Sequence, residues 1–230
     1  MRIGKASVTS PCGIGRVALA IPARAHSADA CDRPGERRAR FGRRGWVMSV
    51  LRLWQTLDRR SGEWRWCLLW NRWAAQRALV RFFGIVSRLG DGAFWYALMA
   101  MLALFGGGHG RIAVLHLAVT GLAAALLYRQ LKRWTRRPRP FRAHHEIVAH
   151  VAPLDEFSFP SGHTLHAVSF TVIALAYFPL LAPVLVPFTL LVGASRVVLG
   201  LHYPSDVLAA AVIGFGLAGT SLWISSAWFG

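Results

Sequence analysis

The sequence predicts an all-α protein, a polytopic bundle with five membrane-spanning helices and one further N-terminal helix lying at the membrane surface. Of its 230 residues, 54% are hydrophobic and only 16% are charged, which is too apolar for a soluble domain of this length. Four long stretches lack Lys, Arg, Asp and Glu altogether, at residues 92–110, 112–128, 164–195 and 207–230. Because a helix needs about 20 apolar residues to cross the hydrocarbon core, these stretches suit membrane spans.

The N-terminal 47 residues differ from the rest of the chain. Residues 1–47 are rich in Arg, Gly and Ala and show no apolar periodicity, so we expect a disordered basic segment. The apolar run at 14–22 is too short and too broken for the core of a signal peptide. The character of the sequence changes at Met48, which predicts a membrane domain over 48–230 and suggests that translation starts at Met48.

A helical pattern covers Trp64 to Leu89, but it carries arginines at 72, 77, 81 and 88. Trp66, Trp70 and Trp73 recur at spacings of four and three, which places them on one face. This mixture of aromatic residues and arginines is typical of a helix in the lipid headgroup region. A sixth span here would bury arginines, at a cost of about 2.5–3.5 kcal/mol for each central one.

The later part of the chain contains the five expected spans. They lie at about 93–108, 112–131, 163–180, 184–202 and 205–228. A basic loop, Lys132 to Pro160, separates the second from the third. In the last span Ala210, Gly214 and Ala218 recur four residues apart, which would let another helix approach closely.

The basic charge of the chain excludes some classes of partner. A formal net charge of +17 would suggest nucleic acid binding in a soluble protein. Here the basic residues lie in the N-terminal segment and beside the spans, so membrane topology and anionic ligands explain them better, and we expect no nucleic acid partner. The three cysteines, Cys12, Cys31 and Cys67, have no metal-binding spacing and predict neither disulfides nor a zinc site.

The expected topology brings the ionisable residues at the span ends to one membrane face. Polar residues inside or beside spans are costly and usually functional. Three short stretches meet there: "KRWTRRPRP" from Lys132, "PSGH" ending at His163, and "SRVVLGLHYPSD" from Ser195 to Asp206. They can be written Lys-x6-Arg-Pro, Pro-Ser-Gly-His and Ser-Arg-x5-His-x3-Asp.

The first group of residues in these stretches predicts a phosphate site. Lys132, Arg139 and Arg196 are cations that repel one another, so their convergence requires an anion, and the arginine fork fits phosphate oxygens. Ser161 and Gly162 precede a helix, where free backbone N–H groups and the helix dipole favour an anion.

The second group predicts phosphoryl transfer. A carboxylate from Asp206 bonded to one imidazole nitrogen of His202 would leave the other nitrogen as a nucleophile. His163 could protonate the leaving oxygen and later activate water. Nucleophile, acid and anion site together favour an enzyme over a non-enzymatic anion-binding protein or transporter, which would not need both histidines.

A metal centre is the other alternative. Its candidate ligands fit no standard metal-ligand spacing, and we expect no bound metal: His144, His145, His150, Asp155 and Glu156.

The three stretches resemble the full signature of the type 2 phosphatidic acid phosphatase (PAP2) superfamily, and the resemblance extends over Met48 to Gly230 in helix order. It implies a phosphatase on a helical bundle that needs neither metal nor cofactor. It also implies that His202 is the nucleophile, that His163 is the acid and base, and that Asp206 orients His202. The implied phosphate ligands are Lys132, Arg139, Ser161, Gly162, His163 and Arg196.

Within the superfamily, the spans argue against the vanadium haloperoxidases, which are typically soluble, and glucose-6-phosphatase-like members have more spans. The short chain is similar to bacterial lipid phosphatases, whose substrates include undecaprenyl diphosphate, phosphatidic acid, phosphatidylglycerophosphate and lipid A. We therefore expect a lipid substrate and a place in the bacterial inner membrane. His166, one helical turn beyond His163, is expected to be a helix-face histidine without a role.

Two features of the sequence predict opposite orientations in the membrane. The positive-inside rule would place the arginine-rich face in the cytoplasm. The resemblance implies the extracytoplasmic face instead, and we favour it because several of those arginines are expected to bind phosphate.

Overall fold

The computed structural model describes residues 56, 62–73 and 76–229. The expected disordered segment 1–47 and the suggested start at Met48 lie outside the described residues. Within the described ranges the chain forms helices and loops without any β-strand, so the all-α prediction is confirmed.

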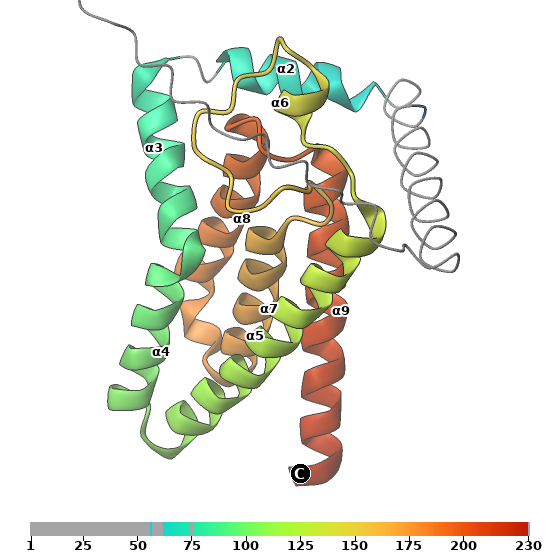
Figure 1. Cartoon of the computed structure of the whole chain (residues 1–230). Coiled ribbons are helices and arrows are strands. Elements are labelled where there is room, and N and C mark those ends of the chain that lie inside the picture. Colours follow the sequence, from blue (N-terminus) through green and yellow to red (C-terminus); the bar gives the residue numbers. More distant parts are fainter. Residues whose placement is uncertain (1–55, 57–61, 74–75, 230) are drawn as a thin grey trace, which may run out of the picture. The chain divides into compact units, whose positions relative to one another are not determined.

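Figure 1 shows the helices in chain order. They are α2 (Glu63–Trp73), α3 (Arg77–Arg88), η1 (Leu89–Ala93), α4 (Phe94–Phe105), α5 (Gly107–Thr135), α6 (Pro140–Ala143), α7 (Gly162–Tyr177), η2 (Pro179–Leu181), α8 (Ala182–Val198) and α9 (Pro204–Phe229).

The central helix of the bundle is α7, which packs against α5, α8 and α9 (Figure 1). Ala167, Ile173 and Ala174 on it are fully buried, and its sequence is apolar nearly all round. A helix of this kind lies inside a bundle, because it has no polar face to present to solvent. The start of α7, which carries the Pro-Ser-Gly-His turn, is thereby held at the centre of one end of the bundle.

The prediction of a single surface helix over Trp64 to Leu89 is wrong. One helix, α2, ends at Trp73, and α3 starts at Arg77 after an extended Gln76 (φ −66°, ψ 124°). From there α3 continues through the π-helical turn η1 into α4. The arginines of α3 are exposed, while Val86 on its opposite side is buried against the bundle, so α3 can pack on α8 despite its charge.

Short helix α2 keeps the expected character of a surface element. It lies across one end of the bundle in Figure 1, and Trp66, Trp70 and Trp73 are exposed. Asn71 fixes it there, because its side-chain amide donates to the carbonyl oxygens of Val148 and Val198 at 2.9 and 3.2 Å.

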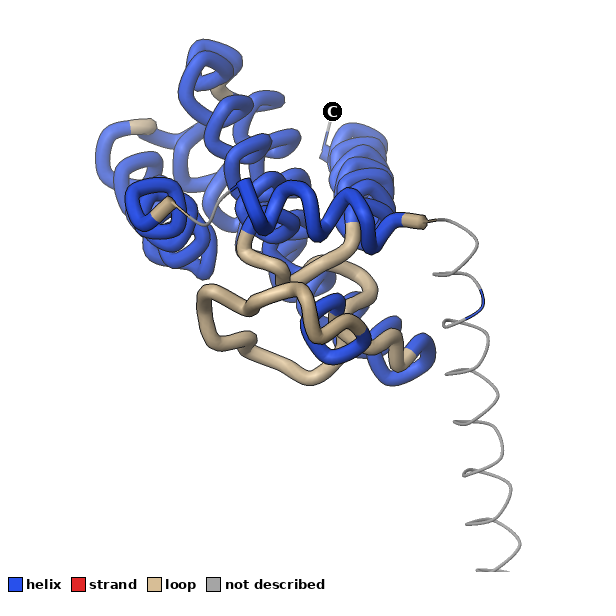
Figure 2. Tube along the Cα trace, turned by 90° about the horizontal axis from the view of Figure 1, so that it is seen from above, coloured by secondary structure: helices blue, strands red, loops and turns tan. Residues whose placement is uncertain are grey.

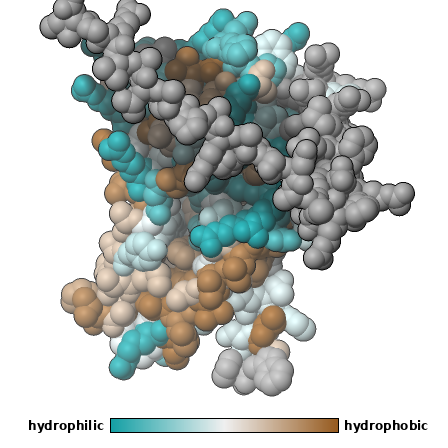
Figure 3. All heavy atoms as spheres, viewed as in Figure 1, coloured by the Kyte–Doolittle hydropathy of each residue, from teal (hydrophilic) through white to brown (hydrophobic). Residues whose placement is uncertain are grey.

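The later helices begin and end within a few residues of the predicted spans. Three helical stretches among the described residues are long and apolar enough to cross a membrane: Gly107–Ala143, Pro179–Val198 and Pro204–Ala227. Large apolar side chains on α4, α5 and α9 are exposed, and Figure 3 shows apolar surface gathered over the half of the bundle around the turn from α4 to α5. Such a surface suits lipid, and the chain is a membrane protein.

The charged span ends gather at the opposite end of the bundle, as the topology predicts. The end of α5, the start of α7, the end of α8 and the start of α9 lie there, whereas the C-terminus lies at the other end (Figure 1). Seen from above in Figure 2, the loop between α6 and α7 lies over these helix ends, next to α2.

Small residues allow α9 to pack tightly on α7, as the spacing of Ala210, Gly214 and Ala218 predicts. Both alanines are fully buried. A Cβ atom added at Gly214 would lie only 2.7 Å from the carbonyl oxygen of Leu165 in α7. The two backbones therefore approach at a distance that only glycine permits.

This contact generates a stability prediction. We expect Gly214→Ala to lower the free energy of unfolding by about 1–3 kcal/mol, because α7 and α9 must separate. The matched variant is Gly216→Ala on the same helix, where an added Cβ meets nothing within 4 Å. It should be stabilising by about 0.5–1 kcal/mol through helix propensity. Thermal unfolding of both variants in detergent measures the difference, and equal melting temperatures would contradict the packing.

Candidate active site

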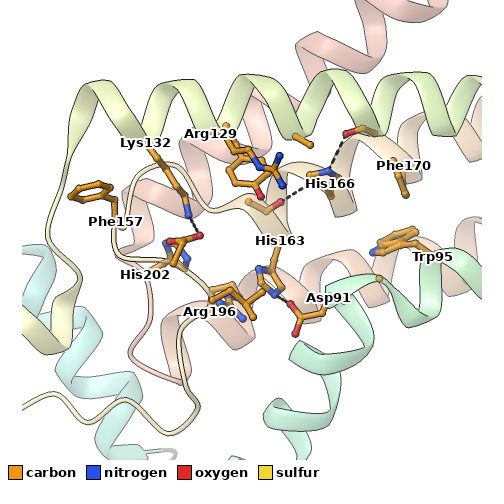
Figure 4. A pocket seen from close by; sticks show the side chains of 18 of the residues that line it. Asp91, Trp95, Arg129, Lys132, Phe157, His163, His166, Phe170, Arg196 and His202 are labelled. Atoms are coloured by element: carbon orange, nitrogen blue, oxygen red, sulfur yellow. Dashed lines mark hydrogen bonds and ion pairs between the residues drawn. The ribbon is translucent and has the colours of Figure 1, made fainter.

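A cavity of about 890 Å³ opens between α5, α7, the η1–α4 segment and the loop before α7. Figure 4 shows this pocket from close by. Ionisable side chains line one end of it: Lys132, Arg139, His163, Arg196 and His202. Apolar and small residues line the other: Trp95, Met99, Ala118, Gly121 and Phe170. The pocket thus joins a polar site to an apolar channel.

The structure brings together all the residues that the sequence proposed for the site. Those that line the pocket are Lys132, Arg139, Gly162, His163, Arg196 and His202. Ser161 and Asp206 are fully buried beside it. Ser161 is the N-cap of α7, and its hydroxyl lies 3.0 Å from that of Thr164.

His202 is buried in a cationic environment. Its Nε2 atom lies 3.4 Å from Nη1 of Arg139. Burial lowers the pKa of His202 well below its usual value, and the nearby cations Arg139, Arg196 and Lys132 lower it further. His202 is therefore neutral at pH 7, and a neutral imidazole keeps the lone pair that a nucleophile needs.

The predicted hydrogen bond between Asp206 and His202 is not formed in this structure. Their Oδ2 and Nδ1 atoms are 3.6 Å apart, which is beyond hydrogen-bond distance. The carboxylate instead accepts hydrogen bonds from Arg137 at 2.7 Å, from the backbone N–H of Tyr203 at 2.9 Å and from the hydroxyl of Ser158. Asp206 is thus the centre of a buried network directly beside the His202 ring.

Arg137 is a residue that the sequence analysis missed. It is 3% exposed, and its guanidinium pairs with the carboxylate of Asp206. The same guanidinium lies 4.0 Å from the centre of the Tyr203 ring. It belongs to the same basic stretch as Lys132 and Arg139, but its spacing alone does not reveal which way it points. A buried carboxylate such as Asp206 requires a paired cation, and that requirement is the signal that could have found it.

Asp155 occupies the place where a phosphate is expected. Its Oδ2 atom lies 2.5 Å from Nζ of Lys132, and its Oδ1 atom lies 2.7 Å from Nη2 of Arg139. Burial would raise the pKa of Asp155, but Lys132 and Arg139 outweigh this effect and hold the pKa below its usual value. One ionised carboxylate is therefore shared by two of the three expected phosphate-binding cations.

The η1 turn and the end of α3 complete the site with two residues that were not predicted to belong to it, and one of them, Ser87, lies in the predicted surface helix. Asp91 in η1 pairs with Nε2 of His163. Ser87 in α3 accepts a hydrogen bond from Nη1 of Arg196 at 2.5 Å. Both contacts orient a side chain that the sequence assigned to the chemistry.

His166, expected to be a helix-face histidine outside the chemistry, lies on the face of α7 that lines the pocket. Its Nδ1 atom lies 3.0 Å from the carbonyl oxygen of Gly162 and its Nε2 atom 3.2 Å from that of Gly121. His166 therefore ties α7 to α5 along the wall of the pocket.

The candidate metal ligands do not converge. His144 stacks on Trp64 with ring centres 5.3 Å apart, and Glu156 pairs with Arg142 at 3.3 Å. Among the described residues there is no group of three or more His, Cys, Asp or Glu side chains that could hold a metal ion.

By its fold and its site, the protein is a helical membrane bundle with a cation-lined pocket at the ends of its helices. Residues 113–229 match the PAP2 superfamily, slightly more than half of the chain, and the chain belongs to that superfamily.

Three curated relatives illustrate the similarity. The chain is 37% identical over 121 residues to undecaprenyl-diphosphatase BcrC of Bacillus subtilis, covering 51% of this chain and 61% of the relative. It is 33% identical over 103 residues to lipid A 1-phosphatase of Rhizobium johnstonii, covering 43% and 42%. It is 32% identical over 74 residues to phosphatidylglycerophosphatase B of Escherichia coli, covering 30% and 29%. The matched part is thus less than two thirds of each relative's length.

Two solved structures share the fold. LpxE of Aquifex aeolicus superposes with a TM-score of 0.61 at 27% identity, over 69% of this chain and 93% of that one. A transmembrane PAP2-type phosphatidylglycerolphosphate phosphatase of Bacillus subtilis superposes with a TM-score of 0.61 at 24% identity, over 80% of this chain and 96% of that one.

The position of Asp155 predicts competition with phosphate. We expect Asp155→Asn to lower the melting temperature without ligand, because Lys132 and Arg139 lose their counter-ion. Added inorganic phosphate should then raise the melting temperature more than in the wild type, because no carboxylate competes for the two cations. The matched control is Glu156→Gln, whose side chain pairs with exposed Arg142 and should respond as the wild type does. Equal phosphate responses in all three proteins would show that Asp155 does not occupy the anion site.

Proposed function

We propose that this protein is a membrane phosphatase that hydrolyses a lipid phosphate or diphosphate through a phosphohistidine intermediate. The observation that carries this proposal is the buried His202 in one pocket with Lys132, Arg139 and Arg196. Those cations would bind phosphate oxygens, and the imidazole beside them would attack the phosphorus. Gly162 would add its backbone N–H at the start of α7. The expected contribution of Ser161 is not available, because its N–H donates to the backbone oxygen of Asp206 at 3.3 Å.

The reaction would proceed in two displacements. Nε2 of His202 attacks the phosphorus while the bond to the leaving oxygen breaks, and His163 gives that oxygen a proton. His163 then takes a proton from water, whose oxygen attacks the phosphorus and releases inorganic phosphate from His202. Asp91 holds His163 in place, and the network around Asp206 holds the loop that carries His202. No step requires a metal or a cofactor.

The shape of the pocket supports a lipid substrate. The charged end lies at the helix ends, and the apolar end continues along α4 and α5 past Trp95, Met99 and Ala118. A lipid whose tail remains in the bilayer could therefore place its phosphate beside His202. The candidate substrates are undecaprenyl diphosphate, phosphatidic acid and phosphatidylglycerophosphate. The names of two relatives agree with the first and the third.

We also propose that the protein spans the bacterial inner membrane with its active site at the extracytoplasmic face. In this arrangement the α3–α4 segment and α7 cross the membrane together with α5, α8 and α9. The C-terminus, at the end of the bundle away from the site, then lies in the cytoplasm.

The proposed chemistry predicts the effect of removing the nucleophile. Purified full-length protein should release phosphate from at least one lipid of a panel containing the three candidates, and chelators should not affect the rate. His202→Ala should lower kcat by at least about 1,000-fold, as the loss of a nucleophile does. The control is His145→Ala, an exposed histidine of the loop, which should keep the wild-type rate. Full activity in His202→Ala would refute the mechanism.

The proposed orientation predicts the outcome of two reporter fusions. A reporter joined to the C-terminus should report the cytoplasm, and one joined after His145, in the loop over the site, should report the other side. The pair should therefore give opposite results. A periplasmic C-terminus would contradict the orientation.

A further inference from the structure

We propose that Arg129 and Arg133 form a second phosphate subsite, so that the preferred substrate carries a second phosphate next to the one removed. This proposal rests on the function proposed above and specifies its substrate class as a lipid diphosphate.

The pocket-lining face of α5 changes character along its length. Ala118, Gly121 and Ala125 form the part of this face in the apolar end of the pocket. Arg129 follows Ala125 one turn later and precedes Lys132 by three residues, and both line the same pocket. Figure 4 shows Arg129 between Lys132 and His166. Arg129 therefore lies at the boundary between the apolar channel and the catalytic cations.

Arg129 and Arg133 are available to bind an anion, because the acidic residues that line the pocket pair with other side chains. Lys132 and Arg139 share Asp155, and Arg196 donates to Ser87. The other acidic residues that line the pocket are also engaged, Asp91 with His163 and Glu156 with Arg142. In the described part of the chain neither Arg129 nor Arg133 has an acidic partner. A terminal phosphate bound by the catalytic cations would leave two cations in the same pocket for a second anion.

The position of Arg129 matches an adjacent phosphate. Three residues along a helix correspond to a rise of about 4.5 Å, so Arg129 is one short step from Lys132 toward the apolar channel. In a lipid diphosphate the second phosphate lies between the terminal phosphate and the tail. With the terminal phosphate beside His202 and the tail in the channel, the second phosphate would lie alongside Arg129. Arg133 follows Arg129 by four residues on the same face of α5 and also lines the pocket, so its long side chain would reach this phosphate from the far side of Lys132.

The subsite would also act on the chemical step. When His202 attacks the terminal phosphorus, the bond from that phosphorus to the bridging oxygen breaks. The bridging oxygen leaves with the lipid monophosphate and takes the electron pair. The guanidinium groups of Arg129 and Arg133 would stabilise the charge that develops on this leaving phosphate, which a monophosphate substrate does not have.

The test compares two substrates with the same tail, farnesyl diphosphate and farnesyl phosphate, in detergent micelles. The measured quantity is the ratio of kcat/KM for the diphosphate to that for the monophosphate. The double variant Arg129→Gln, Arg133→Gln should lower this ratio at least about tenfold, as expected for lost charge-assisted hydrogen bonds. Arg129→Lys should retain part of it. Inorganic pyrophosphate should inhibit the wild type more strongly than inorganic phosphate does, and the double variant should lose that difference.

The control is Arg136→Gln, which removes the same charge at the end of α5 but does not line the pocket, and the ratio should stay at its wild-type value. An equal loss on both farnesyl substrates would overturn the proposal, because it would show that the arginines bind membrane or headgroup without regard to a second phosphate. Absence of all activity in the wild type would refute the proposed function instead, so the two failures are distinguishable.

Discussion

The burial of three cations around one imidazole is the constraint on which the rest of the structure depends. Lys132, Arg139 and Arg196 are each less than 7% exposed, and all three lower the pKa of His202. Like charges repel strongly where the dielectric constant is low, so such a cluster cannot persist without anions. The carboxylate of Asp155 supplies one, paired with Lys132 and Arg139.

The helical bundle supplies the rigid frame that holds this cluster. A central α7 packed on all sides fixes His163 at its first turn, and tight contacts through Gly214 fix α9 and therefore Asp206 against it. The η1 turn between α3 and α4 then brings Asp91 to His163. The backbone of Gly92 is not helical (φ 143°), and this kink between the two helices places the Asp91 carboxylate beside the proposed acid–base group.

Much of this could be predicted from the sequence, and the exceptions have a common physical cause. Uncharged stretches predict the later helices within a few residues, because the bilayer requires long apolar segments. The signature residues converge because they sit at helix ends that the topology brings to one side. By contrast, Asp155 and Ser158 lie in a loop without periodicity, so their direction depends on contacts that no local pattern encodes. The prediction of one surface helix over 64–89 is wrong because arginines indicate a surface position only for the face that carries them. Helix α3 exposes its arginines on one side and packs against the bundle with the other.

A single set of charges serves two purposes in this site. Burial lowers the pKa of His202, and the cations that would bind a phosphate lower it further, so the imidazole of the proposed nucleophile is unprotonated. A phosphate group carries more negative charge than the one carboxylate it replaces on Lys132 and Arg139, so the exchange is favoured electrostatically. Asp155 would then hold Lys132 and Arg139 close together and bind them less tightly than a substrate phosphate would. Because Asp155 lies in the loop between α6 and α7 and not in a helix of the bundle, it could move away from the two cations while the helices stay in place.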